Sequence, residues 1–289
     1  MIGIREFAFE LGSHVRTVED IASMCSAEEV RQIHNIGLEQ IPTDNERMLW
    51  DMIEAVYQKI ETKPDCILIA HSLPFIRTNG SECLLDPSIP TYFLSGLPCA
   101  IMHRAVEAAV QMIRRGSWNT VLVIGADKAY SDQERVFFQT IMGDGVVALL
   151  LSDRAEEHFI LSSWVSTSIF APDGENSDPE DVADFRQRNP TMMRVAIETC
   201  LSLASLTEVD YFVTHTSNRT FWDGLSALCH VPREKFLDGN IRNTGHMNSH
   251  DSFYHYLYWC RQGVIRPRNR VMLINPGFGG SQGCTLLQR

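Results

Sequence analysis

An internal repeat is the feature of this sequence that most restricts its fold. Residues 51–72 and 191–217 each combine helically spaced apolar residues, an acidic turn and an apolar run rich in β-forming residues. Both runs end in a histidine and hydroxyl residues, and these histidines, His71 and His215, lie 144 positions apart. A helix followed by a buried strand is therefore predicted twice.

A second pair of segments repeats at nearly the same spacing. Residues 99–116 and 246–263 are each predicted to form one helix that ends in basic residues and a glycine and leads to an apolar strand. Cys99 and His246, which open the two segments, are 147 positions apart. Each half then closes with a glycine-rich turn and a further apolar strand, at 143–152 and 277–288.

Strands that alternate with helices favour an α/β fold with a largely parallel sheet in each half. The chain is therefore predicted to contain two duplicated halves, residues 1–155 with Cys99 and residues 156–289 with His215 and His246. The acidic, proline-containing segment 171–190 has no clear periodicity and is predicted to be a loop or linker between the halves.

Charge and cysteine usage exclude several classes of protein. The 25 basic and 36 acidic residues give a net charge of -11, which argues against a nucleic-acid partner. The 8 cysteines are scattered without a C-x-x-C pair, so neither a disulfide framework nor a zinc site is indicated. No apolar run of membrane-spanning length and no signal peptide is evident. We therefore expect a cytoplasmic protein without membrane contact, metal or cofactor.

Cys99 lies where a cysteine is suited to nucleophilic chemistry. It follows Pro98 at the predicted start of a helix, where unpaired backbone N–H groups and the helix dipole favour the thiolate. The alternative is a buried structural cysteine, which describes most of the other cysteines. His215 ends a predicted strand, where a ligand can reach it.

Four segments, read in order, carry a resemblance to the β-ketoacyl-acyl-carrier-protein synthase III branch of the thiolase superfamily. Cys99, with its helix and the strand that follows, is similar to the nucleophile helix of that family. The run MGDGVVALLLS at 142–152 resembles its Gly-Asp-Gly turn and strand, and VTHTSN at 213–218 resembles its His-Gln-Ala-Asn segment. The C-terminal GFGGSQG resembles the glycine loop that supplies an amide to the oxyanion hole. Together these segments span nearly the whole chain.

The resemblance implies a thiolase-like fold of five layers, α-β-α-β-α, and a homodimer. It implies that Cys99 accepts an acyl group from an acyl-coenzyme A or acyl-carrier-protein thioester, with His215 as the catalytic histidine. The backbone amides of Cys99 and Gly280 would form the oxyanion hole. Asn218, in the third matching segment, is a candidate supporting residue.

His246 departs from the family pattern. The family has Gly-Asn where this chain has Gly245-His246, which is closer to the Gly-His of elongating ketoacyl synthases and thiolases. Two imidazoles can stabilise the oxyanion formed when a malonyl thioester loses carbon dioxide. A histidine can also act as a base toward an acceptor. Asp251, five residues further on, is a candidate to orient an imidazole, and the pair His246 and His250 lacks the glutamate of a metal motif.

Three functions stay open from the sequence. The favoured one is condensation of acyl-Cys99 with a malonyl-type thioester, in specialised metabolism because His246 departs from the family pattern. The second is acyl transfer to an alcohol, amine or thiol without decarboxylation, and the third is a non-catalytic partner subunit of an active homologue. Ile101 and Met102 follow Cys99 in place of smaller family residues and predict an altered acyl pocket.

Overall fold

The structure is a computed structural model of the chain. The residues it describes are 1–21, 23, 25–73, 85–137, 140–168, 170–171, 177–216, 219–238 and 240–289. Asn218, the candidate supporting residue, lies outside them.

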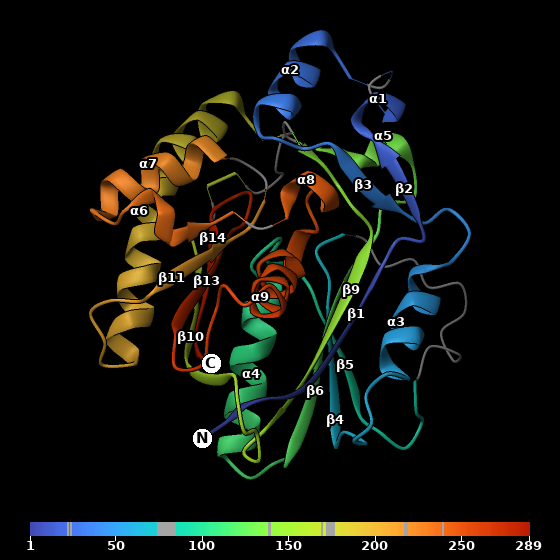
Figure 1. The fold of residues 1–289 in the computed structure, drawn as a ribbon, viewed down its shortest axis with the longest axis vertical. Helices are drawn as coiled ribbons and strands as arrows, with labels where there is room; N and C mark the ends of the chain where they lie inside the picture. The colour runs from blue at the N-terminus through green and yellow to red at the C-terminus, as the bar shows by residue number, and fades with distance from the viewer. Residues whose placement is uncertain are drawn as a thin grey trace.

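Ten strands of the described chain form one mixed sheet, which consists of two equivalent halves (Figure 1). In the first half the order is β1 (Gly3–Leu11), β9 (Gly145–Ser152), β6 (Thr120–Asp127), β4 (Cys66–Ala70) and β5 (Thr91–Leu94). In the second it is β10 (Phe159–Thr167), β14 (Ser281–Gln288), β13 (Arg270–Pro276), β11 (Tyr211–Thr214) and β12 (Phe236–Leu237). The halves join where β1 pairs with β10.

The strand directions repeat as well as the order. In both halves the first three strands pair antiparallel and the last three pair parallel. The predicted duplication is therefore confirmed at the level of topology. The proposed boundary after residue 155 falls in the turn between β9 and β10, and the division into two domains stays a prediction.

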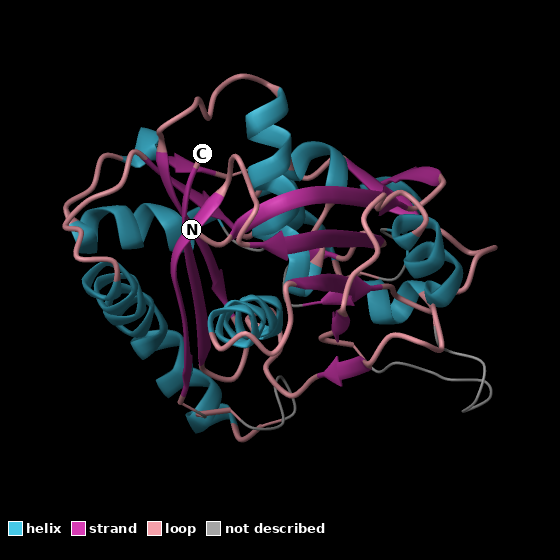
Figure 2. Ribbon diagram, turned by 90° about the horizontal axis from the view of Figure 1, so that it is seen from below, coloured by secondary structure: helices cyan, strands magenta, loops and turns pink. Residues whose placement is uncertain are grey.

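Helices separate and cover the two halves of the sheet. In Figure 1, α4 (Ile101–Arg114) and α9 (Asp251–Arg261) lie between them, α3 (Leu49–Tyr57) covers the first half, and α6 (Pro179–Leu203) with α7 (Arg219–Cys229) covers the second. Figure 2 shows the same arrangement from below, with a helix seen end-on among the strands. The predicted thiolase-like layering, α-β-α-β-α, is confirmed.

Shorter elements complete the described fold. Two two-stranded sheets pair β2 (His14–Thr17) with β3 (Gln40–Thr43) and β7 (Val136–Phe137) with β8 (Thr140–Ile141). The short helices are α1 (Val18–Ile21), α2 (Ala27–Asn35), α5 (Asp132–Arg135), α8 (Ile241–Thr244), η3 (Arg233–Lys235) and η4 (Asn248–His250). Among the helices described, none combines the length and the apolar character needed to cross a membrane.

The central strands are apolar on both faces because helices cover both faces. Every residue of β4, β6 and β9 is buried. The rings of His103 in α4 and Phe253 in α9 pack with centroids 4.8 Å apart, which holds the two central helices together. Since the segments that carry Cys99 and His246 lead into these helices, the middle layer brings the two repeats into contact.

The prediction of a loop at 171–190 is wrong for its second half. Helix α6 begins at Pro179, and the side chain of Asp178 accepts a hydrogen bond from the Glu180 amide and caps the helix. The helix continues through Pro190, although an internal proline costs about 3 kcal/mol. Buried side chains of α6, such as Met193 and Ile197, pack against the second half of the sheet. This packing offsets the cost of the internal proline. It involves strands distant in the sequence, so a short stretch of sequence does not predict it.

Candidate active site

Cys99 lies in the turn that leads into α4. The amide of Ile101 donates to the carbonyl of Pro98 at 3.0 Å, so the first helical residue is Ile101 and Cys99 precedes it by two positions. The side-chain amide of Asn275, in β13, donates to the carbonyl oxygen of Cys99 at 2.9 Å. A residue of the second half therefore fixes the backbone of the predicted nucleophile in the first.

The other buried cysteines differ from Cys99 in their surroundings. Burial raises the pKa of Cys200 and of Cys260 to about 11, and it also raises the pKa of Cys66 and Cys284. These thiols keep their protons at neutral pH and are structural. Cys99 instead has an imidazole beside its sulfur.

His246 lies opposite Cys99, with Nε2 3.6 Å from Sγ. The prediction that a helix starts at His246 is wrong, because α8 ends at Thr244, Gly245 adopts φ 62°, and α9 starts only at Asp251. Position 245 must be glycine, since a Cβ there would lie 2.6 Å from the carbonyl oxygen of Ile141. The short irregular segment directs the imidazole across the site instead of along a helix.

The Gly-Asp-Gly turn holds this segment in place. The His246 amide donates to the Ile141 carbonyl at 2.9 Å, and the Gly143 amide donates to the His246 carbonyl at 3.0 Å. A Cβ at Gly143 would lie 2.1 Å from the carbonyl oxygen of Thr244, so glycine is required by close approach. Asp144 is fully buried and accepts two hydrogen bonds from Arg135, at 2.8 and 2.9 Å. The turn thus supports the site through its backbone.

Asp251 orients His246. Its Oδ2 lies 2.8 Å from His246 Nδ1, and the same oxygen accepts hydrogen bonds from the amide and the hydroxyl of Thr216, at 2.9 and 2.6 Å. Asp251 is 0% exposed and His246 is 1% exposed. A Cys-His-Asp chain therefore runs from Cys99 Sγ to a buried carboxylate, as in nucleophiles activated by an oriented base.

His215 completes the group. It directly follows β11, as predicted, and its carbonyl oxygen accepts a hydrogen bond from Trp222 Nε1 at 3.0 Å. Its ring lies edge-on to the His246 ring, with centroids 4.4 Å apart. Cys99, His215 and His246 each place one ligand-type atom within 4.8 Å of the other two. Such a set also suits a metal ion, and the predicted absence of a metal stays a prediction.

The two imidazoles differ in protonation. Burial opposes the charged form of His246, but the hydrogen bond to Asp251 and the contact with Cys99 outweigh it and raise the pKa of His246 to about 10. Burial and the neighbouring charge of His246 lower the pKa of His215 to about 3. At neutral pH the site therefore contains an imidazolium at position 246 beside Cys99 and a neutral imidazole at position 215.

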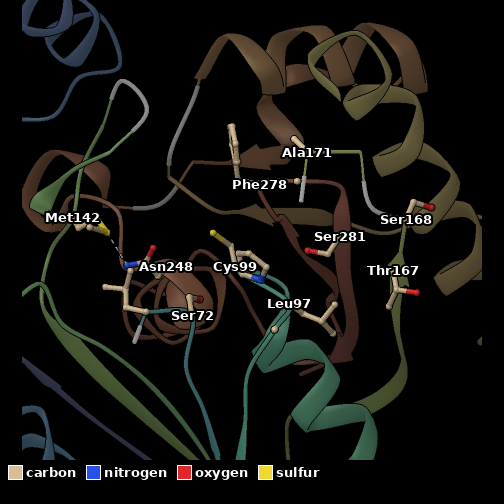
Figure 3. A pocket seen from close by; sticks show the side chains of 14 residues that line it. Ser72, Leu97, Cys99, Met142, Thr167, Ser168, Ala171, Asn248, Phe278 and Ser281 are labelled. Carbon is tan, nitrogen blue, oxygen red and sulfur yellow. Dashed lines mark hydrogen bonds between the residues drawn. The ribbon is translucent and has the colours of Figure 1, made fainter. Parts of the chain in front are cut away.

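A cavity of about 300 Å³ opens above Cys99 (Figure 3). In this view Cys99 lies between Asn248 and Ser281, with Phe278 at the far wall. The Asn248 side-chain amide donates to the Met142 sulfur at 3.2 Å. Ile101 and Met102, which the sequence suggested as determinants of the pocket, are buried in the central core and do not line the cavity. The walls come from loops that follow strands in both halves.

The glycine loop between β13 and β14 borders the same cavity. Gly279 lines it, and Gly280 adopts φ 125°. The Gly280 amide donates to the Gly277 carbonyl at 3.2 Å, which closes a tight turn. The oxyanion hole formed by the amides of Cys99 and Gly280 stays a prediction, and the Gly280 amide would have to turn from Gly277 toward the substrate oxygen.

Two residues around Asp251 were not predicted from the sequence. Thr216 lies next to His215, and His255 follows Asp251 by four positions on α9. The spacing Asp-x-x-x-His places two side chains on one face of a helix, which was the available signal. The spacing alone does not show what the two side chains do, because tertiary packing decides which residues that helix face contacts.

Comparisons with known proteins agree with the fold. Residues 96–168 match the family model of 3-oxoacyl-[acyl-carrier-protein (ACP)] synthase III, and residues 203–289 match the model of its C-terminal part. Together the two models cover more than half of the chain. The β-ketoacyl-[acyl-carrier-protein] synthase III of Mycobacteroides abscessus is 25% identical over 255 residues, 78% of this chain and 74% of that protein. The first three relatives are covered over about three fifths to three quarters of their length.

Solved structures show the same fold at low identity. The 3-oxoacyl-[acyl-carrier-protein] synthase III of Aquifex aeolicus has a TM-score of 0.82 and 19% identity, with 100% of both chains covered. ChlB3, described as an acyltransferase, has a TM-score of 0.84 and 17% identity, with 99% of this chain and 97% of that chain covered. The matched segments contain Cys99, His215 and His246 in the order expected from the resemblance. This chain therefore belongs to the β-ketoacyl-acyl-carrier-protein synthase III-like members of the thiolase superfamily.

Proposed function

We propose that this protein is an acyltransferase that loads an acyl group onto Cys99 and condenses it with a malonyl-type thioester. The observation that carries the proposal is the convergence of Cys99, His215 and His246 beneath one cavity, with His246 Nε2 3.6 Å from the sulfur. The acyl donor would be an acyl-coenzyme A or an acyl carrier protein thioester, and the names of the relatives include the acyl carrier protein. A cytoplasmic location and a role in specialised metabolism belong to the same proposal.

Loading of the enzyme follows from the ion pair. The Cys99 thiolate attacks the thioester carbonyl, and the negative charge on the carbonyl oxygen is stabilised by backbone amides. When the carbon-sulfur bond of the donor breaks, the leaving thiolate takes a proton from His246 Nε2. The product is an acyl-Cys99 thioester and a free thiol.

Condensation then uses both imidazoles as hydrogen-bond donors. His246 Nε2, which gave its proton to the leaving thiolate, first takes a proton from solvent. The malonyl carboxylate then leaves as carbon dioxide, and the electron pair forms an enolate whose oxygen is stabilised by ring N–H groups of His215 and His246. The enolate carbon attacks the acyl-Cys99 carbonyl, and the Cys99 thiolate leaves. His215 fits the donor role because burial lowers its pKa and keeps it neutral, so one ring nitrogen carries a hydrogen that it can donate.

Acyl transfer to an alcohol, amine or thiol is the second candidate, and the His246–Asp251 pair favours it. Once Cys99 is acylated, His246 no longer faces a thiolate and can accept a proton from an acceptor while Asp251 stabilises the resulting imidazolium. This route releases no carbon dioxide. The non-catalytic partner subunit remains the third candidate, and it predicts no acyl-enzyme at all.

Carbon dioxide release distinguishes the first two candidates. Acyl-loaded native protein is expected to decarboxylate a malonyl thioester, and His215→Ala and His246→Ala are each expected to slow this about 10²-fold or more, since each removes an oxyanion donor. The measurement is release of labelled carbon dioxide from malonyl-coenzyme A. His14→Ala, at an exposed histidine, is the control with native rate. Acyl-enzyme that discharges to an added alcohol or amine without carbon dioxide release would replace condensation by heteroatom transfer.

A homodimer is part of the proposal, and the sheet edge supports it. Within the described chain β5 is an end strand that pairs only with β4, and its Tyr92 is 52% exposed. Such edges are normally covered or blocked by charge. Light scattering is expected to give twice the chain mass for the native protein and a shift toward monomer for Tyr92→Lys. Val195→Lys, at a similarly exposed apolar residue on α6, is expected to leave the mass unchanged. A native monomer would contradict the dimer.

A further inference from the structure

The carboxylate of Asp251 contacts a second histidine besides His246. Its Oδ2 faces His246 and Thr216, whereas its Oδ1 lies 2.8 Å from Nε2 of His255. The N–H of His255 does not point straight at that oxygen. Asp251 and His255 are both 0% exposed, so no water replaces the contact. Both carboxylate oxygens therefore lie close to protein groups, Oδ2 through hydrogen bonds and Oδ1 through a close contact with the His255 ring.

The backbone fixes the tautomer of His255. The Asn240 amide lies 3.0 Å from His255 Nδ1. A backbone N–H can only donate, so Nδ1 must offer its lone pair. The ring proton is then on Nε2, the atom that faces Asp251 Oδ1. Metal-bound and catalytic histidines are commonly oriented by a partner that contacts their second ring nitrogen. Here Asp251 is that partner of His246, and His255 contacts Asp251 in turn.

We propose that His255 is a positioning residue of the active site, whose Nε2–H holds Asp251 and through Asp251 keeps His246 and Cys99 in their reactive arrangement. The inference rests on the proposed function, because it assumes that Cys99 is the nucleophile. Without the His255 N–H, one oxygen of a buried carboxylate loses its partner, and the cost of that loss falls on the charged form. Asp251 would then gain a proton or rotate, and His246 would lose its counterion.

Several titratable groups face this carboxylate and its neighbours. They are Cys99 in the turn before α4, Asp127 in β6, His215 after β11, His246 and His250 before α9, and His255 in α9. Removing the polar N–H that lies 2.8 Å from the Asp251 carboxylate makes the negative groups of this cluster hold protons more strongly. The acid limb of any reaction of the Cys99 thiolate must therefore move to higher pH. Because these groups titrate together, the shift in the pH dependence is a property of the whole cluster and not of one residue.

Two substitutions separate the contact with Asp251 from the contact with Asn240. His255→Gln has its amide nitrogen the same number of bonds from Cα as Nε2, so it retains a donor toward Asp251. His255→Asn is one bond shorter, so its oxygen can still accept from the Asn240 amide while the donor toward Asp251 is lost. The two variants differ by one methylene and form a matched pair.

The experiment measures alkylation of Cys99 by iodoacetamide, from acid to alkaline pH, with peptide mass spectrometry to assign the modified cysteine. His255→Asn is expected to react about 10-fold more slowly than the native protein on the acid limb, equivalent to about one pKa unit, and at the native rate on the plateau. His255→Gln is expected to follow the native profile. A profile for folded His255→Asn that coincides with the native one would overturn the proposal, as would a Gln variant displaced as far as Asn.

A second measurement uses the native protein and does not depend on variant folding. Nitrogen NMR of labelled histidines is expected to show His255 as the Nε2–H tautomer at neutral pH, and an Nδ1–H tautomer would overturn the proposal. The outcomes distinguish failure of the proposed function from failure of the positioning role. If native Cys99 reacts no faster than Cys25, the nucleophile of the proposed function fails. If Cys99 reacts faster and only the His255 variants have no effect, the positioning role alone fails.

Discussion

Cys99→Ala is expected to abolish acyl-enzyme formation and to lower kcat/KM for acyl transfer by at least about 10³-fold, because it removes the sulfur that lies 3.6 Å from His246 Nε2. The check is intact-protein mass spectrometry after incubation with a panel of acyl-coenzyme A and acyl-carrier thioesters. Native protein is expected to gain the mass of one acyl group. The identity of the donor that gives this gain also defines the acyl chain.

Two controls make this result specific. Cys25→Ala, at a half-buried cysteine far along the sequence from the site, is expected to acquire the native mass gain. Cys99→Ser keeps the shape of the side chain but replaces the thiolate by a poorly ionised hydroxyl, so its mass gain should also be lost. An acyl adduct that persists in Cys99→Ala would place the nucleophile elsewhere. Absence of any adduct on native protein, with every donor, would favour the partner-subunit function.

Asp251→Asn is expected to slow acylation of Cys99 by about 10³ to 10⁴-fold with little change in structure. The contacts with His246 and His255 outweigh burial and hold the pKa of Asp251 well below its usual value, so the native residue is a carboxylate at neutral pH. An amide at this position can donate to His246 Nδ1, which forces the imidazole proton onto Nε2. His246 then cannot accept the proton of the Cys99 thiol.

The measurement for Asp251→Asn is the single-turnover rate of acylation, with thermal unfolding recorded in parallel. Asp184→Asn, which removes the exposed pair between Asp184 and Arg188, is expected to retain the native rate, since surface ion pairs contribute little. The pH dependence of the acylation rate is a further measurement that separates the variant from the native protein. The native imidazolium at His246 is lost as pH rises through its raised pKa of about 10, whereas the variant should lose it at lower pH. A native acylation rate in Asp251→Asn would show that the Cys-His-Asp chain is not used.

The proximity of Cys99, His215 and His246 has a physical reason that is local in the sequence. Cys99 and His246 occupy equivalent places in two repeats, and each precedes a helix of the central layer, so a duplicated fold must bring them together. His215 follows a buried strand whose carboxyl end opens onto the same layer. Hydrophobic periodicity and spacing suffice to specify these positions, because helices and strands are encoded in short windows.

The same windows were misleading where packing competes with local preference. Segment 171–190 looks like a loop because it is acidic and contains Pro190, yet α6 occupies its second half, from Pro179 onward, and covers the sheet. His246 looks like the first residue of a helix, yet the Gly143 amide and the Ile141 carbonyl hold it in an irregular segment before α9. In both cases a contact between segments distant in sequence outweighs a preference of about 1 to 3 kcal/mol.

The sequence by itself determined the duplication and the α/β layers, since these follow from repeated spacing and patterns that each half contains, and its family resemblance marked Cys99, His215 and His246 as candidate catalytic residues. Only the tertiary structure decided that Asp251 faces His246, that Thr216 and His255 hold Asp251, and that Asn275 fixes the backbone of Cys99. Apart from the contact between Asp251 and His255 within α9, these contacts join residues from different segments, and the one between Asn275 and Cys99 joins the two halves of the chain. Their geometry exists only after the two halves pack against the shared central helices.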